Sequence, residues 1–165
     1  MTAAQRKAAP AGDVIEITRV FDAPRAPVFS MWTDPKHMMR WWAPHGCTTP
    51  HCTMDVRVGG RFHFCIRGPD GKDGWGLGIY LEVVPPERIV YRDSFADPQG
   101  NPVPPSHYGM SAAVPAETIV RVTFTEEGKR TRVTLRHEFP GNVPERDGTA
   151  KGWSEMLERL DEALA

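Results

Sequence analysis

The sequence lacks an excess of charge of either sign. Lysine and arginine together number 20 and aspartate and glutamate 21, so the formal net charge is −1. A chain with this balance has no overall basic field to attract the phosphate backbone of DNA or RNA. We therefore expect no nucleic acid among its partners.

Long apolar runs are also missing. The first residues, MTAAQRKAAPAG, carry charge but contain no apolar core of a signal peptide, and no later segment is long enough to predict a membrane span. Residues 1–12 are therefore expected to be a disordered leader, and the protein is expected to be cytoplasmic. Residues 13–165 have the usual length of a single domain.

Cysteine is scarce, and its count is odd. Three cysteines cannot all pair, and without a secretion signal they are expected to be free thiols. All three lie with three of the six histidines in WWAPHGCTTPHCTMDVRVGGRFHFC, residues 41–65, where this density raises the question of a zinc site. Cys47 and Cys52 are five residues apart, however, and the histidines have no partner at helical spacing. The spacing therefore predicts no metal site.

Signatures of several catalytic families are absent from the sequence. It has no GxSxG nucleophile elbow, no phosphate-binding loop and no dinucleotide fingerprint after a strand. No cofactor is expected. The glycines of WGLGIY fall inside a predicted strand, where they are typical of a bulge or of a close approach between the sheet and a packed group.

Hydrophobic periodicity predicts one strand, two short helices, six strands and one long helix. VIEITRVF is the first strand; the short helices are APRAPVFSMWT and KHMMRWW, the second capped by Asp34 and Pro35. The six strands are CTMDVRV, RFHFCIR, WGLGIYLEVV, ERIVYRDSF, ETIVRVTFTEE and TRVTLRHEF, and residues 149–165 form the amphipathic helix. This order predicts an α+β domain in which a seven-stranded antiparallel sheet curves around the last helix.

The VGG turn between the second and third strands sets their register. A two-residue turn would mix apolar and charged side chains on both faces, whereas a three-residue loop, residues 58–60, pairs Met54 with Phe64 and Val56 with Phe62. We therefore predict this second register. It turns Cys52 inward and His51, His63 and Cys65 outward.

Four motifs together resemble one known family. WWAPHGCT, DVRVGGRFHF, GIYLEVVPPERIVY and GWSEMLERL are similar to segments of the activator of Hsp90 ATPase homologue family, which belongs to the START-like (SRPBCC) superfamily. The resemblance runs from about Val14 to the C-terminus and implies a helix-grip fold like that of birch-pollen allergen. It also implies that the segment with the paired tryptophans lies beside the opening of a cavity.

Aromatic and methionine residues gather in the segments expected around this cavity. Adjacent Trp41 and Trp42 on a short helix are not expected to point inward together, so one of them should line the cavity entrance. Asp93 and His137 are polar but fall in phase with inward-facing neighbours, where they could orient a ligand or act as an acid–base pair. The predicted ligand-binding residues are Trp32, Met38, Trp41, Trp42, Phe62, Phe64, Tyr91, Asp93, Met110, His137 and Trp153. For most of them, plain core packing is the alternative.

The segment ADPQGNPVPPSHYGMSAAVPAE, residues 96–117, is longer than loops of compact domains usually are. It could cover the cavity as a lid, dock against a second copy in a homodimer, or be a mobile insertion. The leading prediction of function is a domain that binds a hydrophobic or amphipathic small molecule. The alternatives are a protein-interaction module related to chaperone activators and a cyclase- or hydrolase-like enzyme.

Overall fold

The computed structural model describes residues 10–165, so most of the predicted leader, residues 1–9, lies outside the described residues. A short 3-10 turn, η2 (Ala11–Asp13), leads into β1 (Val14–Phe21). The other strands are β2 (Thr48–Met54), β3 (Arg61–Arg67), β4 (Asp73–Val84), β5 (Arg88–Ala96), β6 (Glu117–Glu127) and β7 (Arg130–Glu138). They form one antiparallel sheet in the order β1-β7-β6-β5-β4-β3-β2.

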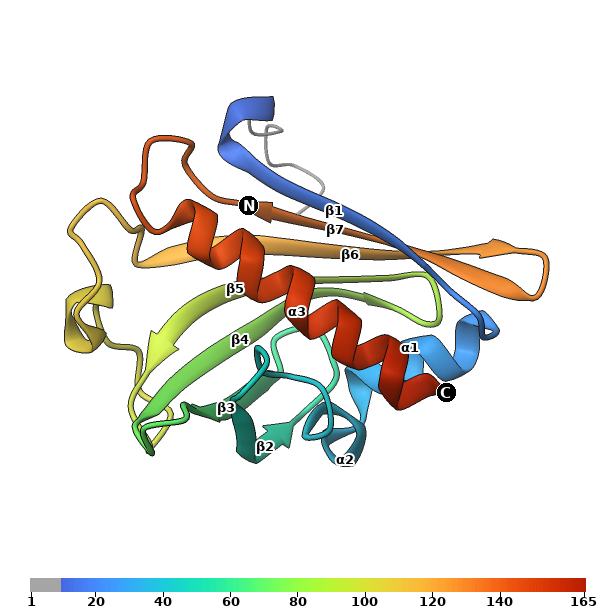
Figure 1. The fold of residues 1–165 in the computed structure, drawn as a ribbon, viewed down its shortest axis with the longest axis horizontal. Helices are drawn as coiled ribbons and strands as arrows, with labels where there is room; N and C mark the ends of the chain where they lie inside the picture. The colour runs from blue at the N-terminus through green and yellow to red at the C-terminus, as the bar shows by residue number, and fades with distance from the viewer. Residues whose placement is uncertain (1–9) are drawn as a thin grey trace.

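Helix α3 (Arg146–Leu164) lies across the sheet, and α1 (Arg25–Thr33) and α2 (Pro35–Met38) lie near its C-terminal end (Figure 1). The predicted α+β fold and order of elements are thus confirmed, although α3 begins three residues before the predicted start. The buried face of α3 consists of Trp153, Met156, Leu157 and Leu160, which join the main core. None of the described helices combines the length and the apolarity needed to cross a membrane.

The paired tryptophans correct one prediction. The Asp34 carboxylate accepts a hydrogen bond from the backbone N–H of Lys36 and caps α2 as predicted, but the helix ends at Met38. Trp41 and Trp42 therefore follow in turns, where successive side chains need not point in helical directions. Both indoles are buried, with exposed fractions of 0% and 3%. The expectation that only one of the pair could point inward is wrong.

The register of β2 and β3 differs from the prediction by two residues. Cys52 pairs with Phe64 and Met54 with Phe62, so the connecting loop covers residues 55–60 instead of 58–60. The strand ends early because Gly59 and Gly60 exchange backbone hydrogen bonds with Tyr80 of β4. A shift of two residues keeps the side chains that remain in β2 and β3 on their predicted faces, since strand side chains alternate with a period of two. Cys65, predicted to look outward, is nevertheless buried.

Two glycines of β4 let aromatic rings lie flat against the sheet. A Cβ atom at Gly76 would lie 2.2 Å from the Phe64 ring, and one at Gly78 would lie 1.9 Å from the Phe62 ring. These rings come from the neighbouring strand β3 and fill the space that side chains of β4 would take. The predicted close approach at the WGLGIY glycines is confirmed, and β4 also has a bulge between Tyr80 and Glu82.

Candidate functional site

A pocket lies between the sheet and the N-terminal half of α3. Its wider part, here called the outer chamber, has a volume of about 520 Å³. A second hollow of about 180 Å³, the inner chamber, adjoins it. The chambers share six lining residues: Pro44, Ile66, Asp93, His137, Thr149 and Gly152.

Small residues on α3 create this hollow. Near the start of the helix, Gly148, Thr149 and Gly152 face the outer chamber, whereas the large buried side chains occur from Trp153 onward. A Cβ atom would meet nothing within 4 Å at Gly148 and only Pro44, at 3.8 Å, at Gly152. The helix therefore fills the space under it at one end and leaves it open at the other.

The long loop after β5 forms another wall of the outer chamber. Met110 and Val114 line the chamber, and Ser111 between them donates to Glu145 from both its backbone N–H and its hydroxyl, at 2.6 and 2.7 Å. These bonds hold the pKa of the Glu145 carboxyl below its usual range. The Tyr108 hydroxyl ties the same loop to the sheet by donating to the Ala96 carbonyl at 2.5 Å.

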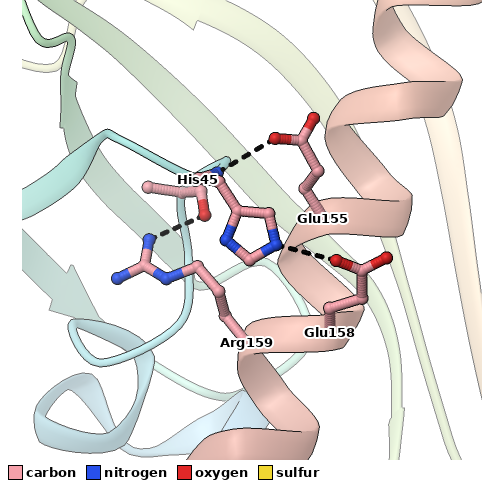
Figure 2. Close-up of polar contacts among 5 residues, drawn as sticks. His45, Glu155, Glu158 and Arg159 are labelled. Carbon is pink, nitrogen blue, oxygen red and sulfur yellow. Dashed lines mark hydrogen bonds and ion pairs between the residues drawn. The ribbon is translucent and has the colours of Figure 1, made fainter.

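Helix α3 is also tied to the segment that carries the paired tryptophans. Figure 2 shows the backbone N–H of His45 donating to Glu155, His45 Nε2 hydrogen-bonded to Glu158 at 2.7 Å, and Arg159 donating to the backbone. The carbonyl that accepts from Arg159 belongs to Ala43, and the distance is 2.7 Å. Because Pro44 lies between these contacts, they fix the wall that it contributes to both chambers.

A chain of hydrogen bonds runs along the pocket. Trp153 Nε1 donates to His137 Nδ1 at 3.0 Å, and His137 Nε2 lies 2.8 Å from the Thr118 hydroxyl. An indole N–H can only donate, so Nδ1 is the acceptor and the proton of the neutral ring is on Nε2. Thr118 therefore accepts from His137, and its own proton is free to face the carboxyl group of Asp93, its cross-strand partner on β5.

Burial moves the pKa values of the two titratable side chains in this chain of hydrogen bonds in opposite directions. It raises the pKa of Asp93 to about 7, against which the Thr118 hydrogen bond acts. It lowers the pKa of His137 to about 4, and the positive charge of Arg146 adds to that effect. Asp93 is only half-buried by exposed area, and the surface that it exposes lines the two chambers, whose walls are mostly apolar. His137 is thus held neutral, and Asp93 is the group that titrates near neutral pH.

The structure brings seven of the eleven predicted ligand-binding residues to the pocket. The residues that line one or both chambers are Trp42, Phe64, Tyr91, Asp93, Met110, His137 and Trp153. The other four, Trp32, Met38, Trp41 and Phe62, pack in the main core instead. Trp32, Trp41 and Trp42 contact one another edge to face, which explains why so many aromatic residues occur close together in the sequence.

Several lining residues were not predicted. Thr118 alternates with buried Val120 and Val122 along β6, and this periodicity could have placed it on the inner face. Gly148 and Gly152 are four residues apart on α3, but a missing side chain gives no apolar signal in a periodicity analysis. Glu145 was not predicted because its contact is with Ser111, in a loop more than thirty residues away in sequence.

The six histidine and cysteine side chains of residues 41–65 do not form one cluster. Cys52 lies in the main core, while His51 and His63 pack around Trp75 on the other face of the sheet. Over residues 10–165, no group of three or more histidine, cysteine, aspartate or glutamate side chains is arranged to hold a metal ion.

Most of this chain resembles a known protein family. A family model described as activator of Hsp90 ATPase homolog 1-like protein matches residues 22–165. A search of curated proteins found no match to the chain.

Solved structures with a similar fold come from several bacteria. A protein of Mycobacterium smegmatis has 26% sequence identity and a TM-score of 0.76, over 93% of this chain and 91% of that one. One of Arthrobacter aurescens has 27% identity and a TM-score of 0.76, over 93% and 86%. One of Nitrosomonas europaea has 21% identity and a TM-score of 0.76, over 94% and 96%.

Proposed function

The chain belongs to the family of activator of Hsp90 ATPase homolog 1-like proteins, and we propose that it binds an apolar or amphipathic small molecule in the pocket between the sheet and α3. The observation that carries this proposal is the composition of the pocket. Apolar side chains form most of its walls, and a few polar groups, chiefly Asp93, Thr118 and His137, meet at one place. Small-molecule sites typically combine a concave apolar surface of this size with a few fixed polar groups.

The way in which the hollow is kept open also supports binding. Glycine inside a helix costs about 1 kcal/mol relative to alanine, yet α3 has two glycines where alanine would fit. A domain under selection for stability alone would gain by filling this space. The two hydrogen bonds from Ser111 to Glu145, here called the latch, also hold the loop after β5 in place as a wall of the hollow.

The acid–base alternative has less support than binding. Asp93 and His137 belong to one network, but Thr118 lies between them. The only basic nitrogen of His137 accepts from Trp153, so it is already occupied and the ring is a poor proton acceptor. We therefore assign His137 the task of positioning Thr118 and Asp93.

Binding can be tested with the neutral fluorescent probe N-phenyl-1-naphthylamine. We expect the wild-type protein to bind it at one site. The variant Gly152→Phe, which adds a ring at a position that lines both chambers, should lose at least about tenfold in affinity, a change of 1.4 kcal/mol. Gly152→Ala is the matched control, because its Cβ meets only Pro44 at van der Waals distance. Circular dichroism and melting temperature check that both variants are folded.

Two results would count against the proposal. One is wild-type protein that does not bind the probe; the other is equal binding by the phenylalanine variant, which would place the probe elsewhere. Native mass spectrometry of protein purified from its host then looks for a retained small molecule. Its absence together with absent probe binding would favour the protein-interaction alternative.

A further inference from the structure

The charged side chains that line the pocket are of one sign. The lining residues of the two chambers include two carboxylates, Asp93 and Glu145, and within residues 10–165 neither lining contains a lysine or an arginine. Arg146 is close enough to affect the pKa of His137, but its guanidinium donates to the backbone carbonyls of Phe139 and Val14. An anionic ligand would thus find no cation in either lining, and a cationic ligand would find no competitor.

The direction of the hydrogen-bond chain points to the same kind of ligand. Each donor in the chain faces toward Asp93: Trp153 donates to His137 and His137 to Thr118, and the hydroxyl proton of Thr118 is left for the Asp93 carboxyl, which pairs with it across β5 and β6. The carboxyl group is therefore the last acceptor and does not use all of its lone pairs within the protein. A molecule in the pocket meets an acceptor there, and a head group that donates hydrogen bonds fits it.

Asp93 also occupies the boundary between two apolar spaces. It lines both chambers, and the inner one is walled by the aromatic side chains Trp42, Phe64, Tyr91 and Trp153. A head group at Asp93 consequently leaves apolar volume for the rest of the ligand. Aromatic rings nearby favour a cation in addition, because their faces carry negative charge density.

From these observations we infer that the pocket selects amphipathic molecules whose polar head is a protonated amine, and that Asp93 pairs with that amine. The inference rests on the proposed function, since it names the class of ligand for the same pocket. It agrees with the raised pKa of Asp93, because a buried carboxylate without a nearby cation is costly and an ammonium group from the ligand would relieve that cost.

Three probes that share one ring system test the inference: 1-naphthylmethylamine, 1-naphthylmethanol and 1-naphthylacetate. Their dissociation constants are measured by isothermal titration calorimetry at about pH 8, where Asp93 is mainly ionised and the amine is protonated. We expect the amine to bind at least about tenfold more tightly than the alcohol, and the acid to bind more weakly than both. The variant Asp93→Asn should remove the advantage of the amine and leave the alcohol within about threefold.

Asp161→Asn serves as the matched control, since it makes the same change at an exposed carboxyl group of α3 that lines neither chamber. It should leave the order of the three probes unchanged. Equal binding of the three probes, tighter binding of the acid, or an amine preference that survives in Asp93→Asn would overturn the inference while the proposed function stands. If none of the three probes binds and N-phenyl-1-naphthylamine does not bind either, the proposed function falls together with the inference.

Discussion

Asp93 and His137 have opposite effects on how the stability of the protein depends on pH. In the folded protein, Asp93 keeps its proton up to about pH 7, whereas its ordinary pKa is 3.8. Between these values the folded state binds a proton that the unfolded state has lost, so this residue makes stability fall as the pH rises. The folded pKa of His137 is about 4 and its ordinary value is 6.5, so between those values it makes stability rise with pH. Over about pH 4 to 6.5 the two slopes cancel.

The variant Asp93→Asn should expose the histidine slope. With the carboxyl group gone, we expect the free energy of unfolding to rise from pH 4.5 to 6.5 by up to about 1.4 kcal/mol per pH unit. At pH 8 the variant should be more stable than the wild type, because it no longer buries a charge. Urea unfolding at a series of pH values measures both effects, and Asp161→Asn, which changes an exposed carboxyl, is the control. A profile parallel to that of the wild type would mean that Asp93 titrates like an exposed carboxyl group.

At the scale of single elements, glycines in β4 and in α3 have opposite effects on packing. Gly76 and Gly78 of β4 make room for rings that are already there, whereas the two glycines of α3 leave room that no protein group fills. The same substitution, glycine to alanine, should therefore have opposite effects on stability in the two elements.

We expect Gly78→Ala to lower the free energy of unfolding by about 1 to 3 kcal/mol, because the new methyl group would overlap the Phe62 ring. That ring cannot move easily, since it also contacts Trp42 and Tyr91. Gly148→Ala should raise the same quantity by up to about 1 kcal/mol through helix propensity. Chemical unfolding of both variants checks the signs, and a stable Gly78→Ala protein would show that the ring has alternative positions.

Periodicity predicted the strands and α3 well because each buries one face along its length. The sequence also indicated Asp34 as the cap of α2, since an aspartate before a proline is a local signal. It did not reveal where α2 ends, because Trp41 and Trp42 are apolar enough to continue a helical pattern. The register of β2 with β3 was missed for a different reason: it depends on Gly59 and Gly60 pairing with β4, a contact between segments that the hairpin sequence does not contain.

The site was less predictable than the fold. Asp93, His137 and Trp153 could be placed on the inner face by their phase with apolar neighbours. Their connection through Thr118 could not, because it depends on the lateral pairing of β5, β6 and β7. Trp32 and Trp41 were expected at the pocket and lie in the core, since composition does not distinguish a ring that lines a cavity from one that fills it.

At the scale of the whole molecule, the latch between Ser111 and Glu145 joins the loop after β5 to the start of α3. Removing both of its bonds with Glu145→Ala should speed amide hydrogen exchange across residues 110–114 by about tenfold or more, because bonds to a charged acceptor are among the stronger ones. Ser111→Ala, which keeps the backbone bond, should have a smaller effect.

Ser106→Ala is a suitable control, because Ser106 is exposed on the same loop and its side chain takes part in no hydrogen bond described for residues 10–165. Hydrogen exchange with mass spectrometry resolves the three variants. If exchange in residues 110–114 is as fast in the wild type as in Glu145→Ala, the latch does not hold the loop in solution.

The pairing of β1 with β7 also constrains how the chain reaches its fold. Every other pair of neighbouring strands is consecutive in sequence, but Thr18 and Thr134 meet across a separation of 116 residues. During synthesis, β1 therefore has no strand to pair with until β7, the last strand, has left the ribosome. Contacts between distant residues slow folding, because the entropy of closing the chain is lost before the contacts form. Translation that stops before β7 thus leaves an N-terminal strand with no neighbour to pair with, however complete the central hairpins already are.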